Sequence, residues 1–253
     1  MIKKSIELSG RTLTLETGRL AKQAGGSVLV TYGETVVLVA TTASKGQDEY
    51  RGFFPLTVDY REKFYASGKI PGGFFRREAR PSEKEIISAR LTDRPLRPLF
   101  PEGFYNETHI FINILSFDGE NNGNLLGTIG ASASLAISDI PWDGPVASVS
   151  VGRIDGEMII NPTITQLEES ELEIIISGTK ESIVMVEGES KFISEEDLLS
   201  VIQYGHEAIK DIVSLQEELV KECGKAKREV LKAEVNEHLV LAVEKLIENK
   251  ILR

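Results

Sequence analysis

The chain has 253 residues, of which 41% are hydrophobic and 27% are charged, proportions that are ordinary for a folded globular protein. This composition excludes a disordered or collagen-like chain. The single cysteine, Cys223, excludes an internal disulfide and indicates a reducing compartment, the cytoplasm. The longest apolar runs are far shorter than the ~20 residues that a membrane span needs, so no membrane is expected among the partners.

Charge is unevenly distributed along this acidic chain, whose formal net charge is -10. Residues 51–100 contain eleven basic and six acidic residues, whereas residues 101–150 contain six acidic residues and no basic ones. Residues 151–200 contain three basic and twelve acidic residues. A polyanion would therefore be attracted to one segment of the chain and repelled by much of the rest.

The first part of the sequence predicts strands followed by a loop. Residues 12–15 alternate, and two β-branched runs, 28–30 and 36–40, flank a turn at Gly33, which predicts a hairpin. The continuous apolar character of the second run predicts a strand buried on both faces. Residues 53–75 are rich in glycine, proline and aromatic residues and predict a loop.

A helix is predicted to begin at Ser82, where Glu85 completes a capping box. Its apolar face is expected to hold Ile86, Ile87 and Leu91, and the two prolines that follow should end the helix.

The second half of the chain predicts further strands and two long amphipathic helices. A strand is expected over 107–117, and the small residues of 124–138 predict a tightly packed helix. One long helix should begin near Ser194, and a second should follow a break at Gly224. This second helix has no partner left in the chain, so we expect the chain to be cut inside a helical domain. The remaining strands are expected over 146–153, 158–160, 172–177 and 183–187, the first two as a hairpin.

The most distinctive stretch combines two adjacent aromatic residues, Phe74 and Phe75, with six arginines within 24 residues. A guanidinium group matches phosphate oxygens bidentately, and exposed rings stack on bases, so this combination is typical of a single-stranded nucleic-acid site. The alternative is that the rings belong to the core and the arginines pair with nearby acidic residues. The arginines are Arg76, Arg77, Arg80, Arg90, Arg94 and Arg97.

Two other patterns are weaker. The small residues between Gly127 and Ser134 would suit a phosphate at a helix N-terminus, but close helix packing is the favoured interpretation. The four glutamates between Glu168 and Glu173 would suit magnesium, but a solvated strand edge is favoured.

Several long motifs resemble the bacterial polynucleotide phosphorylase family. They are FFPLTVDY at 53–60, GKIPGGFFRRE at 68–78 and ARLTDRPLRPLF at 89–100, together with IGASAS at 129–134 and GHE at 205–207. The similarity extends over essentially all 253 residues. It implies a 3′-to-5′ exoribonuclease that uses inorganic phosphate to release nucleoside diphosphates from single-stranded RNA. It also implies a ring-shaped homotrimer with a central RNA channel, and RNA-degradation complexes as further partners.

The resemblance implies an α+β fold. Residues 1–222 would form a first ribonuclease PH-like core, with a mixed β-sheet and packed helices, and residues 223–253 would begin an all-helical domain. In this family the catalytic carboxylates, the lysine and the phosphate-binding serines belong to a second core. No catalytic or metal-binding residue is therefore expected in this segment. Mg²⁺ and the co-substrate phosphate are expected to bind outside it.

The first core is expected to have lost its chemistry. Aligned with the catalytic core's pattern, one aspartate position falls on Leu167, the other on Glu173, and the lysine position on Ile175. A leucine binds no magnesium, and an isoleucine stabilises no developing phosphate charge.

The resemblance also assigns roles to the basic stretch. Phe74 and Phe75 would line the channel constriction, and Arg76, Arg77 and Arg80 would hold the RNA backbone. The other three arginines would face the catalytic core and its phosphate.

Three hypotheses remain open on the sequence. The segment is part of a polynucleotide phosphorylase and is inactive alone, or it is a noncatalytic RNA-guiding subunit of an exosome-like ring. The third is an active ribonuclease PH-like enzyme. A second core encoded after Arg253 would support the first hypothesis.

Overall fold

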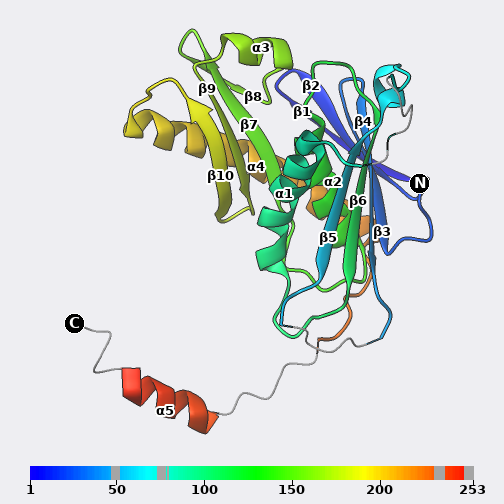
Figure 1. Ribbon diagram of the computed structural model, residues 1–253, viewed down its shortest axis with the longest axis vertical. Coiled ribbons are helices and arrows are strands. Elements are labelled where there is room, and N and C mark those ends of the chain that lie inside the picture. The colour runs from blue at the N-terminus through cyan, green and yellow to red at the C-terminus, as the bar shows by residue number, and fades with distance from the viewer. Residues whose placement is uncertain (47–51, 73–77, 79, 231–236, 248–253) are drawn as a thin grey trace.

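The computed structural model describes residues 1–46, 52–72, 78, 80–230 and 237–247. Within these ranges it contains a six-stranded and a four-stranded sheet with helices packed between and around them (Figure 1). None of the described helices combines the length and the apolar composition that crossing a bilayer requires.

The larger sheet has the strand order β1-β2-β3-β4-β6-β5. Its neighbouring strands are antiparallel except for the parallel pair β5 and β6, so the sheet is mixed and β5 forms one edge. Its strands are β1 (Ile2–Leu8), β2 (Arg11–Thr17), β3 (Gly26–Tyr32), β4 (Thr35–Ala43), β5 (Leu56–Glu62) and β6 (Thr108–Ser116).

The smaller sheet is antiparallel, with the strand order β10-β9-β7-β8. Its strands are β7 (Ala147–Ile154), β8 (Glu157–Ile160), β9 (Leu172–Gly178) and β10 (Ile183–Ser190). The described helices are α1 (Glu83–Leu96), α2 (Gly123–Ile137), α3 (Ile164–Glu169), α4 (Glu195–Cys223) and α5 (Glu237–Ile247), with short 3-10 turns η1 (Phe64–Ser67) and η2 (Arg97–Leu99).

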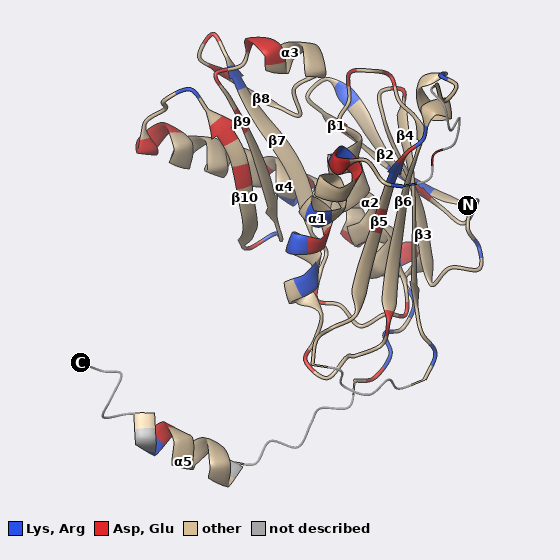
Figure 2. Cartoon of the chain, viewed as in Figure 1, with Lys and Arg blue, Asp and Glu red and all other residues tan. Residues whose placement is uncertain are grey.

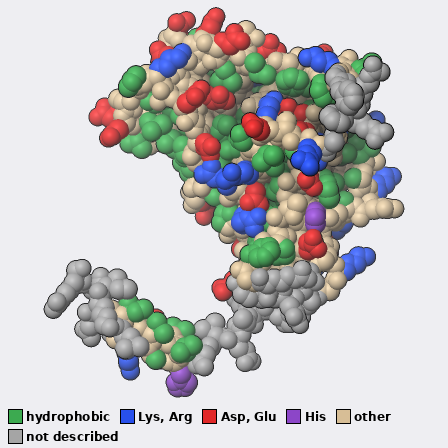
Figure 3. All heavy atoms as spheres, viewed as in Figure 1, with side chains coloured by type: hydrophobic (Ala, Val, Ile, Leu, Met, Phe, Trp, Pro, Cys, Tyr) green, Lys and Arg blue, Asp and Glu red, His purple; other side chains and the backbone are tan. Residues whose placement is uncertain are grey.

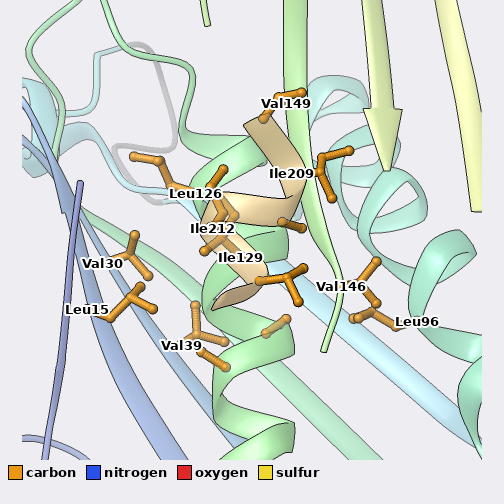
Figure 4. Packing of buried hydrophobic residues seen from close by; sticks show 14 of the residues in the cluster. Leu15, Val30, Val39, Leu96, Leu126, Ile129, Val146, Val149, Ile209 and Ile212 are labelled. Atoms are coloured by element: carbon orange, nitrogen blue, oxygen red, sulfur yellow. The ribbon is translucent and has the colours of Figure 1, made fainter. Parts of the chain in front are cut away.

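The core is centred on α2, which lies between the larger sheet and the pair formed by β7 and α4 (Figure 4). Small residues allow this close approach: a Cβ on Gly130 would lie 2.5 Å from a methyl group of Val39 and 2.8 Å from one of Val30. The Ser132 hydroxyl donates to Gln216 of α4 at 2.6 Å and accepts from the Val146 amide at 2.9 Å. The packing interpretation of these small residues is confirmed, because they belong to α2 and are buried in the core.

Most predicted elements are confirmed, including both hairpins and the capping box of α1, in which the Ser82 hydroxyl accepts from the Glu85 amide at 3.2 Å. The loop prediction over 53–75 is wrong in part, because β5 and η1 lie inside it. β5 pairs in parallel with β6, a strand about fifty residues further along the chain, and the sequence near β5 carries no hairpin signal for such a partner.

Two burial predictions are also wrong. In β4, Val37 and Val39 are fully buried, but Val36 and Leu38 on the opposite face are only partly covered. The predicted apolar face of α1 points away from the core, as described below. The α-helix ends between the two prolines, as predicted: Pro95 lies in the last turn of α1, and the chain tightens into η2 after Leu96.

The segment after α4 remains attached to the core. Lys227 donates from Nζ to the carbonyls of Leu135, Ala136 and Ser138 at 2.8–3.0 Å, so one cation satisfies the open carbonyls at the end of α2. Arg228 pairs with Asp139 at 2.8 Å. The boundary after residue 222 stays a prediction, and core contacts extend at least to Arg228.

Candidate nucleic-acid interface

The outward face of α1, which we define by Ile86, Ile87, Arg90 and Arg94, is exposed. Ile86 and Ile87 are 49% and 56% exposed, whereas the buried face of the helix consists mainly of Glu85, Ser88, Thr92, Pro95 and Leu96. The predicted apolar face therefore points away from the core of this chain. Apolar side chains beside two arginines on one exposed helix face are typical of a surface that binds a partner.

Arg94 links α1 to the smaller sheet. Its guanidinium forms an ion pair with Glu187 of β10, although both side chains remain about half exposed. Figure 2 shows the basic turns of α1 opposite the acidic segments of β9 and β10, and Figure 3 shows Lys and Arg side chains among acidic ones on the same side of the molecule. Arg94 is thus partly neutralised within this chain.

Arg97 is held by its own protein. It donates to both carboxylate oxygens of Asp93 at 2.8 and 2.7 Å, and to the carbonyls of Phe54 and Leu56 at 2.9 and 3.1 Å. Its guanidinium also lies 5.9 Å from the centre of the Phe54 ring. These contacts fasten the end of α1 to the start of β5 and leave little of the group for a ligand.

Arg90 differs from these two arginines. Among the described residues, no carboxylate lies in ion-pair distance of its guanidinium. It lines a groove between α1 and the edge strand β5, together with Asp59, Ile86 and Ala89. Of the three arginines on α1 and η2, Arg90 is therefore the one most available to an anionic ligand.

The segment with the two phenylalanines lies mostly outside the described residues: Phe74, Phe75, Arg76 and Arg77 are not described, and Arg80 is exposed. Glu78 shows where this segment is fastened. Its carboxylate accepts from the Phe64 amide at 2.6 Å and pairs with Lys63 at 3.0 Å. The hydrogen bond from the Phe64 amide and the nearby Lys63 ammonium group hold the pKa of Glu78 below its usual value. The sequence indicates Glu78 only as one of several acidic residues that could pair with the arginines, because its actual partners lie in a segment predicted as a loop.

The positions aligned with the catalytic carboxylates lie together. Leu167 of α3 and Glu173 of β9 line one small pocket at the start of α2, beside Asn122 and Tyr32. Ile175 follows on the same face of β9. This pocket offers a magnesium ion a single carboxylate, and among the described residues no group of three or more acidic, histidine or cysteine side chains is placed to hold a metal. The residues do not fit a magnesium site.

Glu173 carries an unfavourable charge. Burial raises its pKa, and Glu189, directly opposite on β10, raises it further. A raised pKa means that the folded chain binds this proton more tightly than the unfolded chain. Stability is therefore lost as the pH rises from the usual glutamate range through the raised pKa.

Replacing Glu173 with glutamine should raise the free energy of unfolding at pH 7 by about 0.5–1 kcal/mol, because it removes one of two facing like charges. Urea denaturation at pH 7 and at pH 4.5 measures the effect, which should shrink at the lower pH. The Glu181→Gln variant in the exposed turn after β9 is the control. A lower stability of Glu173→Gln at pH 7 would contradict this account.

Comparison with family models matches residues 9–141 to domain 1 and residues 144–208 to domain 2 of the 3′ exoribonuclease family, RNase_PH. The chain belongs to the 3′ exoribonuclease family. A solved structure of this fold, rice (Oryza sativa) Rrp46, superimposes with a TM-score of 0.64 at 16% identity and covers 81% of this chain and 93% of its own. That likeness concerns the fold alone, and it confirms the predicted α+β, ribonuclease PH-like architecture.

Curated relatives within the family are much more similar in sequence. Polyribonucleotide nucleotidyltransferases from Heliobacterium modesticaldum, Geotalea uraniireducens and Thermomicrobium roseum are 51%, 52% and 54% identical to the chain, over 98%, 94% and 93% of its length. The predicted relationship to polynucleotide phosphorylases is thereby confirmed. The chain spans 35%, 34% and 30% of these relatives, about a third of their length.

Proposed function

We propose that this chain is the RNA-binding first core of a polynucleotide phosphorylase and does not itself catalyse the reaction. The observation that carries the proposal is identity of about 50% to polyribonucleotide nucleotidyltransferases over more than nine tenths of the chain. The pocket that contains Leu167 and Glu173 supports the noncatalytic part, because it supplies one carboxylate and no cation at the aligned positions.

The complete protein would degrade single-stranded RNA from its 3′ end in the cytoplasm, as a homotrimer. Inorganic phosphate would attack the terminal phosphodiester in line and release a nucleoside diphosphate, so that one phosphate ester bond is exchanged for an anhydride. Because the two bonds differ little in energy, the reaction would be readily reversible. Mg²⁺ would supply charge neutralisation outside this segment, where the relatives' remaining two thirds lie.

The role that we assign to this chain is to bind the RNA strand. Phe74 and Phe75 would stack on bases, while Arg76, Arg77 and Arg80 neutralise phosphates. Such contacts carry little base information, so binding would be largely independent of sequence. Arg90 would contribute from α1, Arg94 would do so in competition with Glu187, and we assign Arg97 to the scaffold that holds α1 on β5.

A labelled single-stranded oligoadenylate, titrated into the chain at low salt, tests the proposal. We expect binding that weakens as salt rises, since phosphate neutralisation releases counterions. We also expect no release of ADP when phosphate and Mg²⁺ are added. Phosphate-dependent release of ADP would favour an active ribonuclease PH-like enzyme, and absence of binding at low salt would refute an RNA-holding role.

A noncatalytic subunit of an exosome-like ring is the second candidate. It shares the RNA-guiding role, but the likeness to rice Rrp46 is limited to the fold, at 16% identity. We therefore favour the first candidate.

A further inference from the structure

A second pocket, of about 200 Å³, lies at the end of β5, next to the first turn of α2. Its lining is largely apolar and includes Phe64, Phe117 and Ile114. We call it the η1 pocket, because η1 forms one side of it (the short cyan turn in Figure 1). It is lined by Glu62, Lys63, Phe64, Ala66, Ser67, Lys69, Ile114, Phe117 and Gly123.

Three charged residues, Glu62, Lys63 and Lys69, also line the η1 pocket. Glu62 is neutralised by Lys84 at 2.9 Å, and it also accepts from the Tyr60 hydroxyl at 2.7 Å. Lys63 is neutralised by Glu78 at 3.0 Å. For Lys69, no carboxylate of the described chain lies in ion-pair distance. Within the described chain, the pocket therefore combines a largely apolar lining with one cation, Lys69, that no carboxylate neutralises.

The η1 pocket is joined to the segment proposed to bind RNA. Glu78 directly follows Arg77 in the sequence, and its carboxylate holds the backbone amide of Phe64, a wall of the pocket, at 2.6 Å. In the sequence, therefore, the arginine-rich stretch continues directly into a residue that is hydrogen-bonded to a lining residue of the pocket.

The dimensions limit what can enter. Pockets for drug-sized ligands usually measure about 300–1,000 Å³, so 200 Å³ admits a single flat ring system and little else. Aromatic lining residues with a cation beside them suit a nucleobase whose flanking phosphate stays outside the pocket.

We propose that the η1 pocket binds one nucleobase of a single-stranded RNA, stacked on Phe64, with Lys69 pairing with the adjacent phosphate. The proposal rests on the proposed RNA-binding function and extends it to residues outside the arginine-rich stretch. Stacking would tolerate any base, so the pocket would add affinity and register to the strand without reading its sequence.

The test compares two probes, a labelled ten-residue oligoadenylate and inorganic polyphosphate, which has phosphates but no bases. Phe64→Ala should weaken oligoadenylate binding roughly fivefold or more, the range expected for one stacked base, and leave polyphosphate binding unchanged. Lys69→Met should weaken binding of both probes. Tyr65→Ala is the matched control, because Tyr65 is the next residue of the same turn, is 58% exposed and does not line the pocket.

The Phe64→Leu variant guards against a folding artefact, because it keeps an apolar side chain and removes only the ring. It should lose oligoadenylate affinity as Phe64→Ala does. Unchanged oligoadenylate binding by both Phe64 variants, while Arg76→Ala/Arg77→Ala weakens it, would overturn the pocket proposal and leave the RNA-binding function intact. No oligoadenylate binding by the unmodified chain would refute both.

Discussion

Replacing Arg76 and Arg77 together with alanine should weaken binding of single-stranded RNA roughly tenfold or more at low salt. The expected reason is the loss of two phosphate contacts, each of which contributes about 0.7 to the slope of log K against log salt for a single strand. The slope should therefore fall by about 1.4 in magnitude. Fluorescence anisotropy with an oligoadenylate at several salt concentrations measures both quantities.

The control for this prediction removes the same charge elsewhere. Lys180, in the turn before β10, forms a surface ion pair with Glu217 of α4. Lys210 forms one with Glu207, and both of these residues are on α4. Their double replacement with alanine should leave the salt slope nearly unchanged, because long-range attraction is largely screened beyond about 10 Å at 0.1 M salt. If both double variants shift binding equally, net charge alone governs the interaction and the arginines have no special role.

The arginine-rich stretch was visible in the sequence because its signal is compositional and local. The contacts that separate its members were not visible, because they are made to distant residues. Arg97 is bound to backbone carbonyls some forty residues earlier, and Arg94 to a glutamate more than ninety residues later. A spacing of about one helical turn therefore conceals three different environments for Arg90, Arg94 and Arg97.

The outward orientation of the apolar face of α1 has a related cause. Helical periodicity identifies an apolar stripe, but it does not say whether the stripe faces this chain's core or another surface. Here the inward face is closed by polar groups with specific partners: Thr92 and Thr128 share a hydrogen bond at 3.0 Å, and Glu85 binds two amides. Ile86 and Ile87 are left outside. The prediction of an apolar stripe on α1 is correct, but the assignment of that stripe to the core is wrong.

Glu85 is the residue that connects α1 to the edge of the larger sheet. It is 8% exposed, and its carboxylate accepts from the Ser82 amide at 2.6 Å and from the Glu62 amide at 2.9 Å. The first bond completes the capping box of α1, and the second satisfies an outward amide at the end of β5. Arg97 of η2 binds the Leu56 carbonyl at the other end of β5, so α1 and η2 together contact both ends of this edge strand.

Glu85→Ala should therefore lower the free energy of unfolding by about 2–4 kcal/mol. Two amides lose their acceptor at once, and an unsatisfied buried donor costs about 1–3 kcal/mol, in addition to the loss of the helix cap. Urea denaturation at pH 7 measures the change. Glu83→Ala, in the same turn but exposed, is the matched control and should cost only a few tenths of a kcal/mol.

The pH dependence of stability distinguishes the contribution of the Glu85 charge from that of its side-chain packing. Burial acts to raise its pKa, but the Ser82 and Glu62 amides outweigh burial and hold the pKa below the usual glutamate value. The stabilisation is then present above the unfolded pKa and is lost as the pH falls through the lower folded value. Glu85→Gln keeps one acceptor oxygen and no charge, so it should be less stable than the unmodified chain at pH 7, and this difference should narrow on acidification. A difference that stays constant from pH 7 to pH 3 would mean that packing, and not the charged hydrogen bonds, is what Glu85 contributes.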